Sequence, residues 1–104
     1  MNTAVRSIES VAENYSKSWL ERGFNKGNLR TIKPFHTTGL CFTNRIILGL
    51  VISGNLEVQT SLSVNHFVSD EEFLLPANLH FQVSAGILGA VIFFARQKFT
   101  KKFF

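Results

Sequence analysis

The stretch FLLPANLHFQVSAGILGAVIFFA, residues 73–95, contains no charged side chain and is followed directly by a basic segment. Such a run can form the buried strands of a compact β domain, or a membrane-spanning helix, which needs about 20 apolar residues. Polar residues are scattered through its first half, so only residues 85–95 are uniformly apolar. Leu79, Phe81 and Val83 also alternate with polar neighbours, which is the period of a strand and not of a helix. The run therefore predicts β structure.

Charge along the rest of the chain is nearly balanced. All seven acidic residues and seven of the eleven basic residues precede residue 73, so the net charge of +4 belongs to residues 96–104. Hydrophobic residues make up 45% and charged residues 17% of the 104-residue chain, which fits one globular domain with a real core. Eleven phenylalanines favour a dry interior or a membrane contact, because Phe needs no hydrogen-bond partner.

Two further features concern the cellular compartment. Cys41 is the single cysteine, which excludes an internal disulfide and fits a reducing environment. The first residues lack the basic and apolar regions of a secretory signal. We therefore expect a cytoplasmic protein.

The N-terminal segment shows helical spacing of apolar residues. This pattern predicts an amphipathic helix over about residues 3–22, with Gly23 at the position where a left-handed residue ends a helix. The apolar side should pack on the rest of the domain through these residues: Val5, Ile8, Ala12, Trp19 and Leu20.

Short runs of β-branched and aromatic residues follow, and they predict a mainly β fold of six to eight antiparallel strands. Gly54-Asn55 predicts a two-residue hairpin turn. Pro76 should end a short strand at residues 73–75, because proline cannot donate to a β ladder. Gly86 and Gly89 are expected to break the last apolar run. We expect a single domain over residues 1–104: the helix, a β-barrel or sandwich at about 29–95, and a basic-aromatic segment at 96–104.

The order VISG (51–54), NLEV (55–58) and EFLLPANLHFQV (72–83), followed by a last apolar strand, resembles a known pattern. It is similar to the cupin-like N-terminal domain of AraC-type transcription regulators, over about residues 49–95. The resemblance implies a cupin-like barrel that binds a small ligand or a second subunit. The chain lacks the His-x-His and glutamate pattern of metal-binding cupins, so we expect no metal and no cofactor. No helix-turn-helix pattern follows the last strand, so the resemblance implies a fragment of a regulator or a stand-alone relative.

Aromatic residues are the candidate walls of a ligand site, because apolar surfaces suit an acyl chain or another apolar effector. The candidates are Phe42, Phe67, Phe73, Phe81 and Phe93, with Phe94 beside them. His36, His66 and His80 lack the close spacing of metal ligands and are expected to be ordinary surface or turn residues. Cys41 lies in a predicted strand and is expected to be a small buried residue.

The C-terminal segment interleaves basic and aromatic residues, a composition that suits single-stranded nucleic acid or an anionic lipid surface. The candidate contacts are Arg96, Lys98, Lys101 and Lys102.

These patterns contain no nucleophile–base pair or paired carboxylates, so we expect a non-enzyme. The expected role is a ligand-sensing or dimerisation domain of a bacterial transcription regulator, with an apolar effector and a second copy of the chain as partners. Nucleic acid would be contacted only through the C-terminal segment or a missing domain. Two alternatives stay open: a small membrane-associated protein anchored through Phe73–Ala95 or the basic segment, and a small cupin enzyme.

Overall fold

A computed structural model describes residues 8–98. One helix, α1 (Ile8–Glu21), precedes six strands. The strands are β1 (Asn28–Ile32), β2 (Thr37–Thr43), β3 (Ile47–Thr60), β4 (Val64–Val68), β5 (Glu72–Leu75) and β6 (Leu79–Arg96). The predicted mainly β fold with one N-terminal helix is confirmed. The first residues of the predicted helix, 3–7, lie outside the described part of the chain.

All six strands belong to one antiparallel sheet built around the two long strands β3 and β6. β1 pairs with residues 90–94 of β6, and β2 pairs with residues 79–84. In the same way β5 pairs with residues 47–50 of β3, and β4 with residues 55–59. Each long strand thus takes part in two four-stranded layers. Layer 1 contains β1 and β5, and layer 2 contains β2 and β4.

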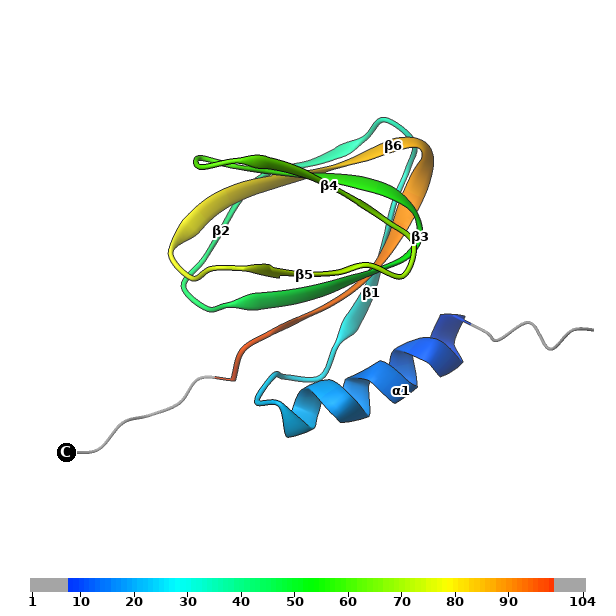
Figure 1. Cartoon of the computed structure of the whole chain (residues 1–104), viewed down its shortest axis with the longest axis vertical. Coiled ribbons are helices and arrows are strands. Elements are labelled where there is room, and N and C mark those ends of the chain that lie inside the picture. The colour runs from blue at the N-terminus through cyan, green and yellow to red at the C-terminus, as the bar shows by residue number, and fades with distance from the viewer. Residues whose placement is uncertain (1–7, 99–104) are drawn as a thin grey trace, which may run out of the picture.

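The sheet folds over on itself where both long strands are irregular. The pairing of β3 with β6 shifts register between Val51 and Ser53 and again between Gly54 and Leu56. Gly54 and Gly89 have φ angles of 86° and 71° there, a backbone region that glycine enters without steric cost. Figure 1 shows the two layers one above the other, joined through these bends. The sheet does not close into a barrel, and of the two expected forms the two-layered one is observed.

The bends correct two predictions. Gly54-Asn55 is not a hairpin turn, because β3 runs through both residues to Thr60. The hairpin instead joins β3 to β4 through residues 61–63, where the Thr60 hydroxyl accepts hydrogen bonds from the amides of Leu62 and Ser63. Gly86 and Gly89 bend the last apolar run without ending it, since β6 is one continuous strand. The end of β5 before Pro76 is as predicted.

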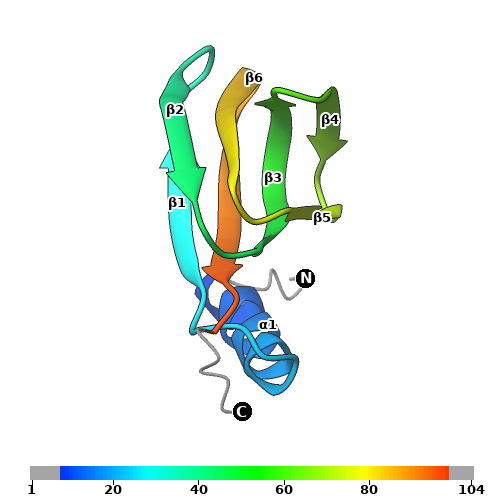
Figure 2. The same ribbon diagram turned by 90° about the vertical axis from the view of Figure 1, so that its left-hand side faces the viewer.

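Helix α1 covers the outer face of layer 1, as Figures 1 and 2 both show. Ala12 and Trp19 are buried there against Leu48, Leu50 and Phe93 of the sheet. These two residues pack as predicted, whereas Ile8 and Leu20 are 38% and 40% exposed, and Val5 lies outside the described residues.

The helix ends as the sequence predicts. Gly23 has a φ of 93°, its amide donates to the carbonyl of Leu20, and the amide of Phe24 donates to the carbonyl of Trp19. This pair of bonds is a Schellman motif, which satisfies carbonyls that the helix leaves free. Phe24 is buried in the same cluster as Trp19, so the motif also directs the chain back to the sheet.

The charge-free run at residues 73–95 forms β5, the turn after it and most of β6. Among residues 8–98, no helix has the length and apolar character needed to cross a membrane.

Candidate functional site

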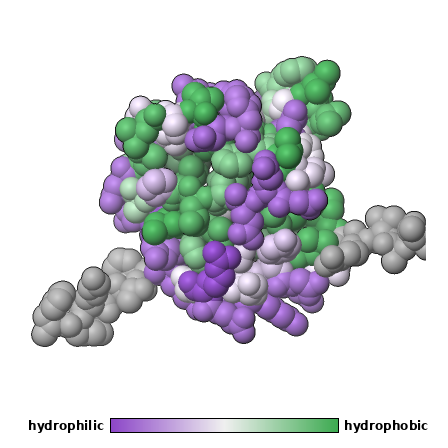
Figure 3. Space-filling model, viewed as in Figure 1, coloured by the Kyte–Doolittle hydropathy of each residue, from purple (hydrophilic) through white to green (hydrophobic). Residues whose placement is uncertain are grey.

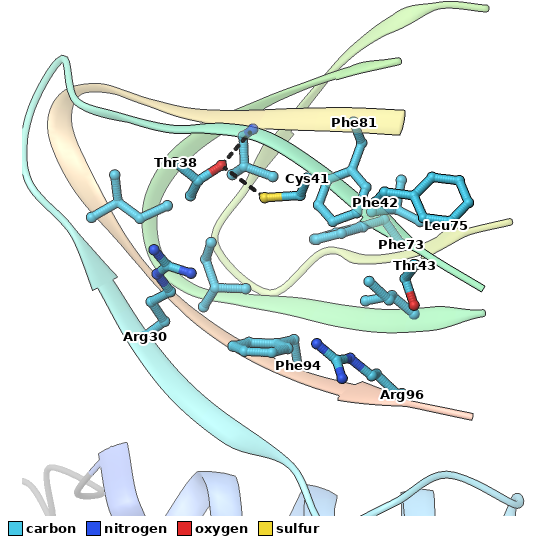
Figure 4. Close-up of a pocket in the computed structure, with 14 residues that line it drawn as sticks. Arg30, Thr38, Cys41, Phe42, Thr43, Phe73, Leu75, Phe81, Phe94 and Arg96 are labelled. Carbon is cyan, nitrogen blue, oxygen red and sulfur yellow. Dashed lines mark hydrogen bonds between the residues drawn. The ribbon is translucent and has the colours of Figure 1, made fainter. Parts of the chain in front are cut away.

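One cavity, of about 180 Å³, lies between the two layers. Its walls come from β1, β2, β3, β5 and both halves of β6, as Figure 4 shows. Most of the wall is apolar. The fully aliphatic or aromatic residues are Ile32, Phe42, Ile47, Phe73, Leu75, Phe81, Val83, Ile92 and Phe94. Hydrophobic side chains also reach the surface on the face where the layers are seen edge-on (Figure 3).

The bend in β6 decides which of its side chains face the cavity. Before the bend, Phe81 and Val83 point inward, and after it Ile92 and Phe94 do. The inward positions therefore change from odd to even numbers, because extra residues at the bend shift the alternation by one. Phe93, on the odd side, faces the other way and stacks on Trp19 of α1, with 4.7 Å between ring centroids.

Three of the five predicted ligand-contact residues line this cavity. Phe73 and Phe81 belong to its inner wall, and Phe42 lies at its edge, 53% exposed and against the ring of His80. Phe67 stacks on Phe73 with 4.8 Å between centroids and lines two neighbouring pockets instead. Phe93 is not a wall of the cavity, since it is buried beneath the helix.

Gly49 makes room for one wall residue. It pairs with Phe73 across β3 and β5, and a Cβ added to Gly49 would collide with the Phe73 ring. The ring thus lies directly over the glycine, as aromatic residues often do opposite glycines in sheets. Phe73 is held between Gly49 and Phe67, which fixes the floor of the cavity.

The polar side chains that β2 contributes to the wall have partners within the protein. The Thr38 hydroxyl oxygen accepts from the Val83 amide at 3.2 Å and lies 3.8 Å from the Cys41 sulfur, both drawn in Figure 4. This hydroxyl replaces a ladder bond where β2 shifts register between Thr37 and Leu40. Cys41 is half-buried, and its thiol also lies 3.6 Å from the carbonyl oxygen of Gly39. Cys41 was expected to be a small buried residue, but it is only partly buried and lines the cavity.

Two arginines complete the lining, Arg30 from β1 and Arg96 from the end of β6. Both are solvent-exposed, so they lie where the cavity meets water. Arg96 was predicted to contact nucleic acid or lipid, and Arg30 was not among the predicted site residues. Of the other predicted contacts, Lys98 is exposed and its amide donates to the carbonyl of Gly23, while Lys101 and Lys102 lie outside the described residues.

The three histidines lie in different environments. His36 is bonded through Nδ1 to the carbonyl of Pro34 at 3.0 Å, and His80 packs on Phe42. His66 Nε2 lies 3.1 Å from a carboxylate oxygen of Glu57, its direct partner across β3 and β4. Within residues 8–98, no three metal-ligating side chains come together.

No protein-family model and no curated protein sequence matches the chain. Its structure is nevertheless similar to many solved structures. The Cnp3 cupin domain of Schizosaccharomyces pombe matches with a TM-score of 0.67 at 12% identity, over 76% of this chain and 58% of that one. An RmlC-like cupin from Shewanella frigidimarina matches with a TM-score of 0.63 at 8% identity, over 73% and 68%.

An oxalate decarboxylase from B. subtilis matches with a TM-score of 0.66 at 15% identity, over 73% of this chain and 22% of that one. The chain therefore spans little more than half of the Schizosaccharomyces pombe domain and about a fifth of the decarboxylase. Likeness at such low identity concerns the fold alone. The cupin part of the predicted resemblance is confirmed, and the regulator part stays a prediction. The chain has a cupin fold.

Proposed function

We propose that this chain is a non-catalytic cupin domain that binds a small apolar molecule between its two layers. The observation that carries the proposal is the cavity of about 180 Å³, whose wall is mainly aliphatic and aromatic. Concave, mostly apolar sites with a few polar groups are the usual form of small-molecule binding sites. As in the sequence-based expectation, the domain would act as the ligand-sensing or dimerising part of a bacterial transcription regulator in the cytoplasm.

The composition of the wall favours binding over catalysis. Its fourteen lining residues include one thiol, Cys41, and two hydroxyls, Thr38 and Thr43, but no histidine and no carboxylate. A thiol or hydroxyl nucleophile needs a base within hydrogen-bond reach. The Thr43 hydroxyl instead accepts from the amide of Arg45 at 3.2 Å, and the Cys41 thiol lies against Thr38 and Gly39.

Filling the cavity should abolish binding. Val83→Phe adds a ring to the middle of the wall, and we expect it to remove the binding of toluene, a neutral one-ring probe. Toluene should shift amide signals of β2, β5 and β6 in ¹H–¹⁵N spectra of the wild-type chain and leave those of Val83→Phe unchanged. Val68→Phe is the matched control, since Val68 is 55% exposed on β4. Loss of binding in both variants, or no shifts in the wild type, would contradict the proposal.

The proposed dimer has a candidate surface on layer 2. Four paired residues form a row across its outer face, in the order Leu40, Gln82, Gln59 and Val64. The two apolar residues at the ends of this row, Leu40 and Val64, are 73% and 51% exposed. Exposed apolar side chains on one face often mark a contact between proteins. Sedimentation equilibrium should therefore give twice the chain mass of 11.7 kDa, and Leu40→Lys should return it to the monomer. Leu62→Lys, in the β3–β4 turn, should not. A monomeric wild-type chain would contradict this part of the proposal.

A further inference from the structure

We propose that the ligand is a small carboxylic acid whose apolar body occupies the cavity and whose carboxylate pairs with Arg30 and Arg96. This inference rests on the proposed function, because it names the class of molecule that the same cavity binds. Three features of the structure lead to it: the charge of the lining, the position of the arginines and the volume of the cavity.

The lining has a positive charge that no acidic side chain of residues 8–98 neutralises. Arg30 and Arg96 are its only ionisable basic groups, and no acidic residue is among the fourteen that line the cavity. All seven acidic side chains belong to the described part of the chain, yet neither arginine forms an ion pair with any of them. Arg22 shows the contrast, since it lies 3.9 Å from a carboxylate oxygen of Glu72.

The two arginines share one face of layer 1. Arg30 pairs with Ile92 across β1 and β6, and Arg96 follows on β6 with Phe94 between them. Ile92, Phe94 and Arg96 are alternate residues of one strand, so they point to the same side of the sheet. Figure 4 shows the Arg96 guanidinium beside Phe94 and the Arg30 guanidinium on the opposite side of that ring, toward Thr38. A carboxylate at this side of the cavity would therefore lie between positive charges from two strands.

The chemistry of the arginines selects the anion. A guanidinium offers two parallel N–H donors that match the two oxygens of a carboxylate. Both arginines are solvent-exposed, so the carboxylate would keep part of its hydration and avoid the large cost of burying an ion. The apolar body would then lie deeper, between Phe81 and Ile92.

Volume limits the size of that body. A cavity of about 150 Å³ holds one benzene molecule, so the 180 Å³ observed here accommodates one six-membered ring with a short substituent, or an alkyl chain of similar volume. A long acyl chain would extend well beyond this space. The expected class is thus short aryl or alkyl carboxylates, such as 3-phenylpropanoate or hexanoate.

The test compares an acid with its neutral amide. We expect 3-phenylpropanoate to bind at least tenfold more tightly than 3-phenylpropanamide in isothermal titration calorimetry. Arg30→Gln and Arg96→Gln should each weaken binding of the acid by about three- to tenfold and leave binding of the amide unchanged. The double variant should bind acid and amide alike. Arg22→Gln, which removes the same charge on the helix side, is the control and should change neither.

Salt supplies a second readout on the unmodified chain. Because the arginines are exposed, their attraction for the carboxylate should weaken between 0.05 and 0.5 M salt, while binding of the amide should not. Equal binding of acid and amide, unaffected by either arginine variant, would overturn the inference but leave the apolar cavity as a binding site. If toluene, acid and amide all fail to bind, both the inference and the proposed function are wrong.

Discussion

Trp19→Ala is expected to lower the free energy of unfolding by about 3–5 kcal/mol, the range for removing a buried large aromatic side chain. Trp19 is fully buried and stacks on Phe93, with an edge contact to Tyr15 at 6.0 Å between centroids. It is the largest side chain between α1 and layer 1. In a domain of this size the loss corresponds to a fall in melting temperature of about 12 °C or more.

Urea unfolding followed by far-UV circular dichroism measures the effect, since the variant lacks the chain's single tryptophan and its fluorescence. Trp19→Phe is the matched control. The indole Nε1 of Trp19 is buried and has no hydrogen-bond partner among the described residues. Phenylalanine keeps a stacked ring and removes this unpaired donor, so it should cost less than half as much. An alanine variant within about 1 kcal/mol of the wild type would mean that α1 contributes little to the fold.

The N-terminal helix and its end were predictable because their signals are local. Ala12 and Trp19 recur at helical spacing, and Gly23 ends the helix with a positive φ as its type and position indicate. The end of β5 before Pro76 was also predictable, because proline has no backbone N–H to donate to a neighbouring strand wherever it lies in the fold. The cupin fold was predictable from the order of the strand segments along the chain, since that order carried the resemblance.

The bends were not predictable from local signals. A glycine followed by asparagine is typical of a hairpin, but at Gly54 the same conformational freedom serves a bulge within one strand. What decides between them is a non-local contact, the close approach of Gly54 to Gly89, which are 35 positions apart and both have positive φ.

The candidate site was predictable only in part for the same reason. Phe81 lies before the bend of β6, where the alternation read from the sequence is correct, and Phe73 lies in the short strand β5. Beyond the bend the alternation is shifted, so of the two neighbouring candidates Phe94 lies in the wall and Phe93 does not, and Arg96 faces the cavity. The sequence around Arg30 does not show that its side chain faces the cavity, because that depends on how β1 pairs with β6. Gly86 and Gly89, in a run of apolar residues, were the indications that the alternation changes there.

The second large expected effect is a loss of stability from a substitution at the bend of β3. Gly54→Ala is expected to lower the free energy of unfolding by about 3–5 kcal/mol. Part of this, about 1–2 kcal/mol, is the cost of a left-handed conformation for a residue with a side chain. The rest is steric, because a Cβ on Gly54 would collide with the carbonyl oxygen of Gly89, which is backbone and cannot rotate away. Urea unfolding of the variant measures the sum.

Gly23→Ala separates the two contributions. Gly23 has a similar φ of 93°, but nothing lies within 4 Å of a Cβ built there, so only the conformational cost applies. Asparagine tolerates the left-handed region better than alanine, and Gly23→Asn should therefore recover most of the loss at that position. Gly54→Asn should recover none of the steric part, because its Cβ meets the same carbonyl. If Gly54 were an exposed hairpin residue, all four variants would follow conformational preference alone. Equal losses for Gly54→Ala and Gly23→Ala would thus contradict the continuous, bent β3 on which the two-layered fold and its cavity depend.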